Sequence, residues 1–266
     1  MKKVISFSLW CQDTKLDPKN PSQNKNMYIQ GVYHNLELKK EIYKDWTFRF
    51  YVNNTVPQDI QEEIVRRGGE IIDMSNSKIP GMYWRFLAIE DPTVDLFIVR
   101  DVDSRISERE ELSVNDWIKS DKVMHVLRDH PHHYYKILGG MWGYKNYKEN
   151  SILNNKYRLK FNDMLHDFLK SKKFNFKRME DMYFMDQVYD ILEQHNCVLA
   201  HDNFFKISKN SLRFPNHENY IKDNYYHYVG EIFDENNNPT NISRDKELQN
   251  NYKTIMRGHW SSQHWV

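Results

Sequence analysis

The 266-residue sequence has little of several residue types, and each shortage excludes a class of protein. Its two cysteines, Cys11 and Cys197, are too few for the disulfide framework of a small secreted domain. Lysine and arginine number 38 against 37 acidic residues, so the chain lacks the basic surplus of a dedicated nucleic-acid-binding protein. No stretch approaches the roughly 20 apolar residues of a membrane-spanning helix. The sequence therefore predicts neither a nucleic-acid partner nor a transmembrane segment.

The start of the sequence also lacks a secretory signal pattern, because only residues 4–10 are apolar before polar residues follow. Nine glycines and eight prolines form no linker that would divide the chain. Hydrophobic residues make up 39% of the sequence and aromatic residues 14%, which is ample for a core. We therefore expect one cytoplasmic domain over residues 1–266, with both thiols reduced.

Short segments rich in β-branched and aromatic residues alternate with helical patterns in the first hundred residues. The expected strands are 4–10, 47–52, 70–74 and 95–99. A helix is expected after Pro57, with Thr55 as its N-cap and Gly68 as its stop, and another over residues 83–89. Parallel strands joined by helices need crossover connections, so the expected fold is α/β, with a mostly parallel sheet flanked by helices. The unbroken apolar run at 95–99 predicts its central strand.

Weaker signals continue in the second half. Ser107 and Glu110 have the spacing of a capping box, which predicts a helix running through Ile118. Residues 123–127 and 197–200 are expected as strands, and the apolar stripe from 184 to 192 as a helix. From about residue 210 the sequence turns polar, and the pattern assigns no element there.

The most informative pair of side chains is Asp101 and Asp103, directly after the expected central strand. Open α/β sheets bind ligands beyond the carboxyl ends of their strands, so the two carboxylates fall where a site is expected. Aspartates at i and i+2 offer hard oxygen ligands to Mg²⁺ or Mn²⁺ holding a diphosphate. A D-x-D triplet alone is weak evidence, because most charged pairs are solvated surface. Its position after a buried strand is what favours a metal site.

Arginines and glycines accompany these aspartates. Arg85, Arg100 and Arg105 have the fork geometry that suits phosphate oxygens, although Arg100 and Arg105 could instead pair with the aspartates and hold the turn. Gly139 and Gly140 would let the backbone approach a ligand.

Trp142, in the same GGMWG segment as these glycines, offers a ring for stacking on a sugar; the alternative is a tight turn with a buried tryptophan. The histidines at 130, 132 and 133 invite a zinc interpretation, but no further ligand set at zinc-site spacing accompanies them.

Two later polar positions are also candidates. Asp186 lies almost opposite the apolar stripe of its expected helix, so it faces either solvent or a cleft. His201, at the end of the last expected strand, is a candidate third metal ligand, as are His227 and His259. Spacing does not choose among the three histidines.

Taken together, these segments resemble glycosyltransferases of the GT-A type that use sugar nucleotides, specifically a bacterial and viral group. The matching text is WRF at 84–86, RDVDSR at 100–105, RDHP at 128–131, GGMWG at 139–143, DQ at 186–187, HD at 201–202 and VGEIFDENNNP at 229–239. The blocks occur in order over most of the chain. Cys11 stands after SLW where the resemblance leads us to expect glycine, a departure near the base-binding loop.

The resemblance implies a metal-dependent transfer of a sugar from a UDP- or GDP-sugar to a glycan or glycoconjugate acceptor. Residues 1–105 would form the nucleotide-binding half, and 106–266 the acceptor half with a C-terminal extension. Mn²⁺ or Mg²⁺ would be the cofactor. The roles implied are catalysis by Asp186 and Asp129, donor binding by Trp10, Arg85, Arg100, Asp101, Gly139 and Gly140, acceptor binding by Trp142 and His130, and metal binding by Asp101, Asp103 and His201.

Two other functions compete with this one. A metal-dependent nucleotidyltransferase would use the same carboxylates but attack a phosphorus atom. A non-enzymatic carbohydrate-binding module would use the tryptophans and tyrosines for stacking, and would not need a D-x-D at the end of a buried strand.

Overall fold

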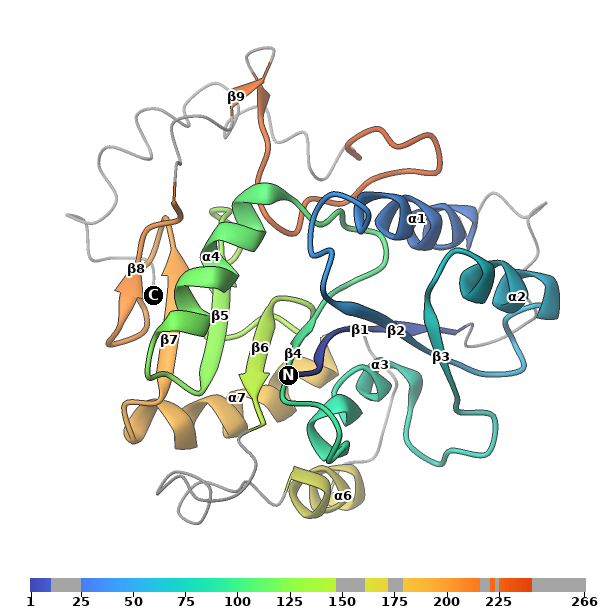
Figure 1. Ribbon diagram of the computed structural model, residues 1–266. Helices are drawn as coiled ribbons and strands as arrows, with labels where there is room; N and C mark the ends of the chain where they lie inside the picture. Colours follow the sequence, from blue (N-terminus) through green and yellow to red (C-terminus); the bar gives the residue numbers. More distant parts are fainter. Residues whose placement is uncertain (11–24, 147–160, 172–178, 216–220, 223–224, 241–266) are drawn as a thin grey trace.

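The computed structural model describes residues 1–10, 25–146, 161–171, 179–215, 221–222 and 225–240, and every structural statement below refers to these residues. Its centre is an eight-stranded sheet with the order β3-β2-β1-β4-β6-β5-β7-β8 (Figure 1). The strands are β1 (Lys3–Leu9), β2 (Thr47–Val52), β3 (Glu70–Asp73), β4 (Leu96–Val99), β5 (Met124–Arg128), β6 (Trp142–Lys145), β7 (Val198–Asp202) and β8 (Ser211–Leu212). All neighbours are parallel except β6, which runs antiparallel to β4 and β5. The expected mostly parallel sheet is confirmed.

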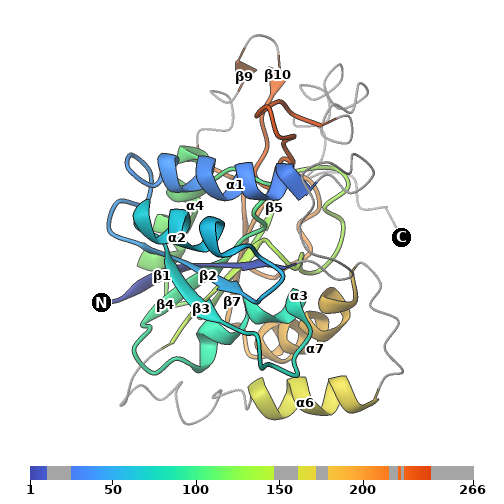
Figure 2. The ribbon, with the colours of Figure 1, turned by 90° about the vertical axis from the view of Figure 1, so that its right-hand side faces the viewer.

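Helices cover both faces of this sheet (Figure 2). One face is packed by α1 (Lys25–Leu38), α2 (Gln58–Arg66) and α4 (Glu108–Lys119), which bury apolar residues such as Val32, Ile64 and Trp117 against it. The other face is packed by α3 (Gly81–Trp84), the 3₁₀ helix η1 (Leu87–Glu90), α6 (Phe161–Ser171) and α7 (Glu180–Gln194). A separate antiparallel pair, β9 (Ile221–Lys222) and β10 (Tyr225–Tyr226), lies apart from the main sheet.

The sequence located most of these elements. The six expected strands are present within two residues at each end, and the unbroken apolar run of β4 lies in the middle of the sheet. The side chain of Ser107 accepts a hydrogen bond from the Glu110 N–H, so the expected cap of α4 is confirmed. Gly68 has φ +85°, the left-handed conformation that ends a helix, as expected after α2.

Other expectations were wrong or incomplete. Thr55 does not cap α2, because the helix begins later, at Gln58, and the Thr55 hydroxyl instead donates to Asn53 at 2.5 Å. Residues 83–89 form two short helical pieces, the end of α3 and most of η1, instead of one helix. Helices α1 and α6 and strand β6 had no counterpart in the sequence prediction.

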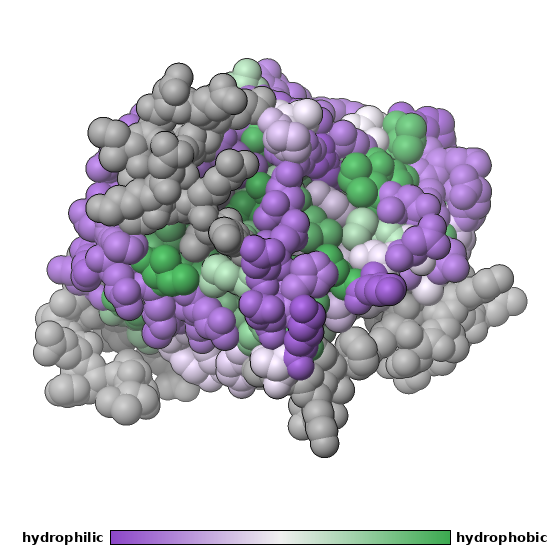
Figure 3. All heavy atoms as spheres, turned by 90° about the horizontal axis from the view of Figure 1, so that it is seen from below, coloured by the Kyte–Doolittle hydropathy of each residue, from purple (hydrophilic) through white to green (hydrophobic). Residues whose placement is uncertain are grey.

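Hydrophilic side chains cover most of the face shown in Figure 3, with smaller hydrophobic patches between them. Among the described residues, no helix is long and apolar enough to cross a membrane.

Candidate active site

The turn that carries Asp101 and Asp103 directly follows β4 and packs against α1. The Asn35 side chain donates to the Ser104 carbonyl at 2.8 Å and accepts from the Ile106 N–H at 3.0 Å. Gly31, one turn earlier in α1, lies so close to the turn that a Cβ there would overlap the Val102 carbonyl oxygen. Both contacts fix backbone atoms, so α1 sets the path of the turn and leaves its carboxylates available.

Arg85 links two carboxylates at this edge of the sheet. Its guanidinium forms an ion pair with Asp101 and donates to Asp181 Oδ2 at 2.8 Å. The Arg85 backbone is itself anchored on β1, because its N–H donates to Ser8 Oγ at 2.9 Å and its carbonyl accepts from Ser6 Oγ at 2.6 Å. Burial raises the pKa of Asp181, and the charge of Arg85 opposes that shift. The result is a fixed Asp101–Arg85–Asp181 group.

Gly139 and Gly140 pack directly against this group. A Cβ at position 139 would overlap the Asp181 carboxylate, and one at position 140 would overlap the Asp101 carboxylate. Both glycines are buried, so their backbone lies where no larger residue fits without moving a carboxylate. The structure therefore brings together four of the expected donor-site residues, listed here as Arg85, Asp101, Gly139 and Gly140.

Asp103 differs from Asp101 in its environment. Burial, and then the negative charge of Asp101, raise the pKa of Asp103 to about 7. The Asp101 side chain is 48% exposed and has Arg85 beside it. Asp101 and Asp103 repel each other, and burial also disfavours the charged form of Asp103. A divalent cation bound by both carboxylates would offset these two effects.

This donor set fits Mg²⁺ or Mn²⁺ in one particular way. Within the part of the chain that the structure describes, no three His, Cys, Asp or Glu side chains are grouped closely enough to hold a metal. Mg²⁺ is usually bound through one or two carboxylates, with phosphate and water oxygens completing its octahedron. Asp101 and Asp103 would supply the two carboxylates of that pattern.

Two arginines from the motif are engaged elsewhere. Arg100 is buried, pairs with Glu110 of α4 at 2.8 Å and donates to the Val99 carbonyl at 2.6 Å. Arg105 donates to Asn237 Oδ1 at 2.8 Å and lies over the Phe233 ring. Arg100 therefore joins β4 to α4, which disfavours the contact with a sugar-nucleotide donor that was expected of it. Its ion pair is structural, as in the alternative interpretation, but the partner is Glu110 and not an aspartate of the turn.

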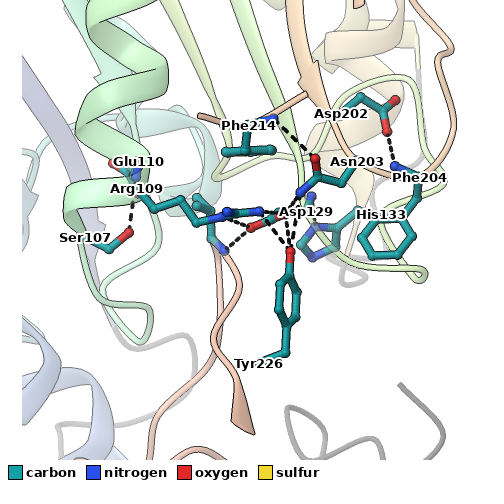
Figure 4. A network of polar contacts seen from close by, with 11 residues as sticks. Ser107, Arg109, Glu110, Asp129, His133, Asp202, Asn203, Phe204, Phe214 and Tyr226 are labelled. Carbon is teal, nitrogen blue, oxygen red and sulfur yellow. Dashed lines mark hydrogen bonds and ion pairs between the residues drawn. The ribbon is translucent and has the colours of Figure 1, made fainter. Parts of the chain in front are cut away.

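Asp129, expected as a catalytic carboxylate, is completely buried at the end of β5 (Figure 4). Its carboxylate accepts hydrogen bonds from Arg109 Nε and Nη2 at 2.8 Å each and from the Tyr226 hydroxyl at 2.8 Å. It also accepts from Asn203 Nδ2 at 2.5 Å and from the Val229 N–H at 3.0 Å. A carboxylate with all its acceptor positions occupied in this way has no lone pair directed at a substrate. This geometry supports a structural role for Asp129.

The aromatic candidates divide between core and site edge. Trp142 opens β6 with its ring fully buried, packed on Phe86 and Phe97 at centroid distances of 5.3 and 5.4 Å, so neither ring face is open to a sugar. This placement favours the buried alternative over acceptor stacking. His130 is buried against the Tyr228 ring at 4.4 Å. Trp10, half-buried after β1, packs over Gly81 and remains at the carboxyl edge, where donor binding was predicted.

His201 lies apart from the two aspartates of the turn. It is buried in β7, where its Nδ1 is 2.8 Å from His125 Nε2 and its Nε2 is 3.7 Å from Asp116 of α4. Burial lowers the pKa of His201 to about 4, and burial together with His201 lowers that of His125. The pair is therefore neutral near pH 7, and its partners are unlike those expected of a third metal ligand. Of the other two candidates, His227 contacts Glu231 at 2.9 Å, and His259 lies outside the described residues.

Asp186 is half-buried on α7, and the charged groups that act on it are Lys136 and Asp190. Those two residues form an exposed ion pair at 2.8 Å. Asp181, one and a half turns nearer the start of the same helix, is the α7 carboxylate that contacts Arg85. Sequence reasoning missed Asp181 because it precedes the apolar stripe; an acidic residue in the first turn of a helix was the available signal.

The comparisons with known proteins are limited to structure. No protein-family model matches the sequence, and a search of the curated proteins finds no match. Among solved structures, the galactosyltransferase LgtC in complex with donor and acceptor sugar analogs is similar with a TM-score of 0.47 and 12% identity, over 77% of this chain and 74% of that one. The 4-diphosphocytidyl-2C-methyl-D-erythritol synthase of Anaerococcus prevotii gives 0.46 and 10%, over 95% and 96%.

The apo-form glycosyltransferase GlyE of Streptococcus pneumoniae gives a TM-score of 0.46 and 14% identity, over 80% of this chain and 45% of its own length. All three scores are below 0.5. The assignment of an α/β fold is therefore based on the strand order and the helices of this structure, and not on these similarities.

Proposed function

We propose that this protein is a metal-dependent glycosyltransferase that moves a sugar from a UDP- or GDP-sugar to a glycan or glycoconjugate acceptor. One observation carries the proposal: Asp101, Arg85 and the Gly139–Gly140 backbone meet beyond the carboxyl end of the central strand. That is the position at which open α/β sheets bind nucleotides. The ordered sequence blocks that resemble GT-A enzymes support the same conclusion.

In this proposal, Asp101 and Asp103 hold a divalent cation that neutralises charge on the leaving diphosphate. Arg85 is already oriented by Ser6, Ser8 and Asp181, so it can face a phosphate oxygen with little reorganisation. Gly139 and Gly140 let the Asp181 and Asp101 carboxylates lie directly against the backbone at this site.

We assign to Asp181 the role that the sequence gave to Asp186. Its carboxylate is held beside Arg85 and Gly139, and burial raises its pKa, which favours a group that accepts a proton. In an inverting enzyme it would accept the proton of the acceptor hydroxyl; in a retaining enzyme it would lie beside the anomeric carbon. Asp186 stays a prediction, with solvent as its alternative.

The experiment that tests this function is a thermal-shift panel of UDP, GDP and CTP, each with and without Mn²⁺. A ligand that binds only the native state raises the midpoint of unfolding. The proposal requires that UDP or GDP stabilise the protein and that the shift depend on Mn²⁺. Stabilisation by CTP or another triphosphate, with pyrophosphate released from the triphosphate when a sugar phosphate attacks its α-phosphorus, would instead identify a nucleotidyltransferase.

A second measurement separates an enzyme from a binding module. Release of UDP or GDP from its sugar nucleotide, followed with and without simple glycosides as acceptors, should require Mn²⁺. A protein that bound glycosides without metal and released no nucleotide would be a carbohydrate-binding module, and the transferase proposal would fail.

A further inference from the structure

Residues 226–240, here called the C-terminal clasp, cross the same edge of the sheet as the candidate site. The sequence assigned no element to this asparagine-rich stretch. In the structure it joins two regions far apart in sequence: the end of β5, at Asp129, and the turn after β4, at Asp103. Its two ends are held by different kinds of contact.

The first end is held by a buried polar network (Figure 4). The Tyr226 hydroxyl donates to Asp129 Oδ1 at 2.8 Å and accepts from Arg109 at 2.9 Å. Three residues on, the Val229 N–H donates to Asp129 Oδ2 at 3.0 Å. Tyr226 and Asp129 are both fully buried, so these bonds do not compete with solvent.

The second end is held by the backbone of the Asp103 turn. Ile232 forms an antiparallel bridge with Ser104, and the Phe233 N–H donates to the Asp103 carbonyl at 2.9 Å. Arg105 adds its bond to Asn237 and its contact with the Phe233 ring. The clasp therefore pairs with the Asp103 turn much as a short extra strand would.

The two ends are joined by a turn in which the Glu231 N–H donates to the Tyr228 carbonyl at 3.2 Å, and the second end is braced by hydrogen bonds of its own. Phe233 bridges Pro239, and the Thr240 N–H donates to the Ile232 carbonyl at 2.9 Å. The Asp234 carboxylate accepts from the N–H groups of Asn236 and Asn238 at 3.0 and 2.8 Å. Because Val229 and Ile232 are only three residues apart and are joined by the 228–231 turn, a displacement of the first end has a short path to the second.

We propose that Tyr226 is a positioning residue for the candidate site: by fixing the clasp on Asp129, it sets the backbone that presents Asp103. The inference deepens the proposed function, since it names what orders the metal-binding turn. The effect of Tyr226 on the order of the Asp103 turn does not require a bound metal. The Tyr226 hydroxyl bonds to Asp129 and Arg109, so in this proposal its effect reaches Asp103 through residues 229–233.

The test is amide hydrogen exchange, read by mass spectrometry on peptides covering residues 101–106 and 229–240. Tyr226→Phe removes one hydroxyl and keeps the ring. Tyr189→Phe is the matched control, because the Tyr189 hydroxyl is also buried, with a 2.8 Å bond to Ser208 in another part of the molecule. Loss of the hydroxyl removes its bonds to Asp129 and Arg109, so local opening should accelerate by roughly tenfold or more. We expect this in both peptides for Tyr226→Phe and in neither for Tyr189→Phe.

Unchanged exchange at 101–106 in Tyr226→Phe, or equal acceleration in the control, overturns the inference. A second readout separates it from the proposed function: the Mn²⁺ concentration that gives half of the UDP-dependent thermal shift. If exchange accelerates and this concentration rises in Tyr226→Phe only, positioning of a metal turn is supported. If exchange accelerates and UDP causes no metal-dependent shift even in the parent protein, the clasp still positions the turn, and the assigned metal chemistry fails.

Discussion

Two aspartate groups lie at the same edge of the sheet, and they differ in how fully their charge is compensated. Asp129, after β5, has zero exposure and five donor bonds from four residues. Asp101 and Asp103, after β4, share one close arginine, Arg85, and one of them has its pKa raised to about 7. A fully satisfied carboxylate stabilises the fold, whereas an incompletely satisfied pair stores unfavourable energy that a ligand can relieve. Similar residues in similar topological positions can thus have opposite roles.

The largest effect is expected when a carboxylate of the turn after β4 is removed. Asp103→Ala should abolish the Mn²⁺-dependent thermal shift with UDP or GDP, with a weaker loss in Asp101→Ala, because each removes a metal ligand. The fold should remain, since neither substitution opens a core cavity. Asp121→Ala, at a carboxylate 83% exposed, is the control. An unchanged metal dependence in Asp103→Ala would show that this turn holds no cation.

The converse substitution, Asp129→Ala, should destabilise the protein itself. It leaves the Arg109 charge buried and unpaired, which typically costs about 3–5 kcal/mol in the free energy of unfolding. Urea denaturation measures the change. Asp190→Ala breaks the exposed pair with Lys136 and should cost at most about 1 kcal/mol. Equal losses in the two variants would contradict the contrast between a buried and an exposed carboxylate.

The two carboxylates of α7 sharpen the comparison within one helix. Asp181→Asn should lower turnover by roughly 100-fold or more, as expected for loss of a group that moves a proton. Asp186→Asn should change turnover little, because its charged neighbours are Lys136 and Asp190. Steady-state kinetics with a UDP- or GDP-sugar decides, and the reverse order of effects would return the catalytic assignment to Asp186.

The smallest effect concerns pH. His201 has a folded-state pKa of about 4 against 6.5 in the unfolded chain, and that of His125 is also lowered. The stability these neutral histidines provide is complete above pH 6.5 and is lost as the pH falls toward 4, by at most about 1.4 kcal/mol per pH unit for each. His201→Gln should flatten this slope, measured by urea denaturation at several pH values.

His195→Gln, at an exposed position, is the control for the pH series. If the free energy of unfolding depended on pH equally in the parent protein and in His201→Gln, the buried His125–His201 pair would not be the cause of the loss of stability at low pH.

The elements that the sequence revealed are those with strong local signals. β4 is an unbroken apolar run, and the α4 cap has its Ser-x-x-Glu spacing, so both could be located without knowing their neighbours. β6 could not, because residues 142–145 include Gly143 and show no strand periodicity. Gly143 lies so close to β4 that a Cβ would contact Ile98, so the strand depends on its two neighbours in the sheet.

The same division applies to the candidate site. Asp101, Arg85, Gly139 and Gly140 were predicted together because strand ends meet at one edge of a sheet. Asn35 and the clasp could not be, because they bond to backbone atoms of the turn from about 70 and 130 positions away in the sequence. Pairings over such separations leave no periodic trace in a single sequence. For His201 and Trp142, residue type favoured a ligand contact, whereas their burial favours a packing role.

The antiparallel direction of β6 has an evolutionary consequence. Since β5 ends and β6 begins at the carboxyl edge, the connection between them, residues 129–141, leaves and re-enters the sheet at one side without a crossover. Its length is free of the minimum that a parallel connection imposes. Insertions or deletions there would alter the rim of the candidate site while preserving strand order. Homologues should therefore diverge most readily in the middle of this connection, residues 132–136, and a library that varies these residues tests whether the rim sets ligand preference.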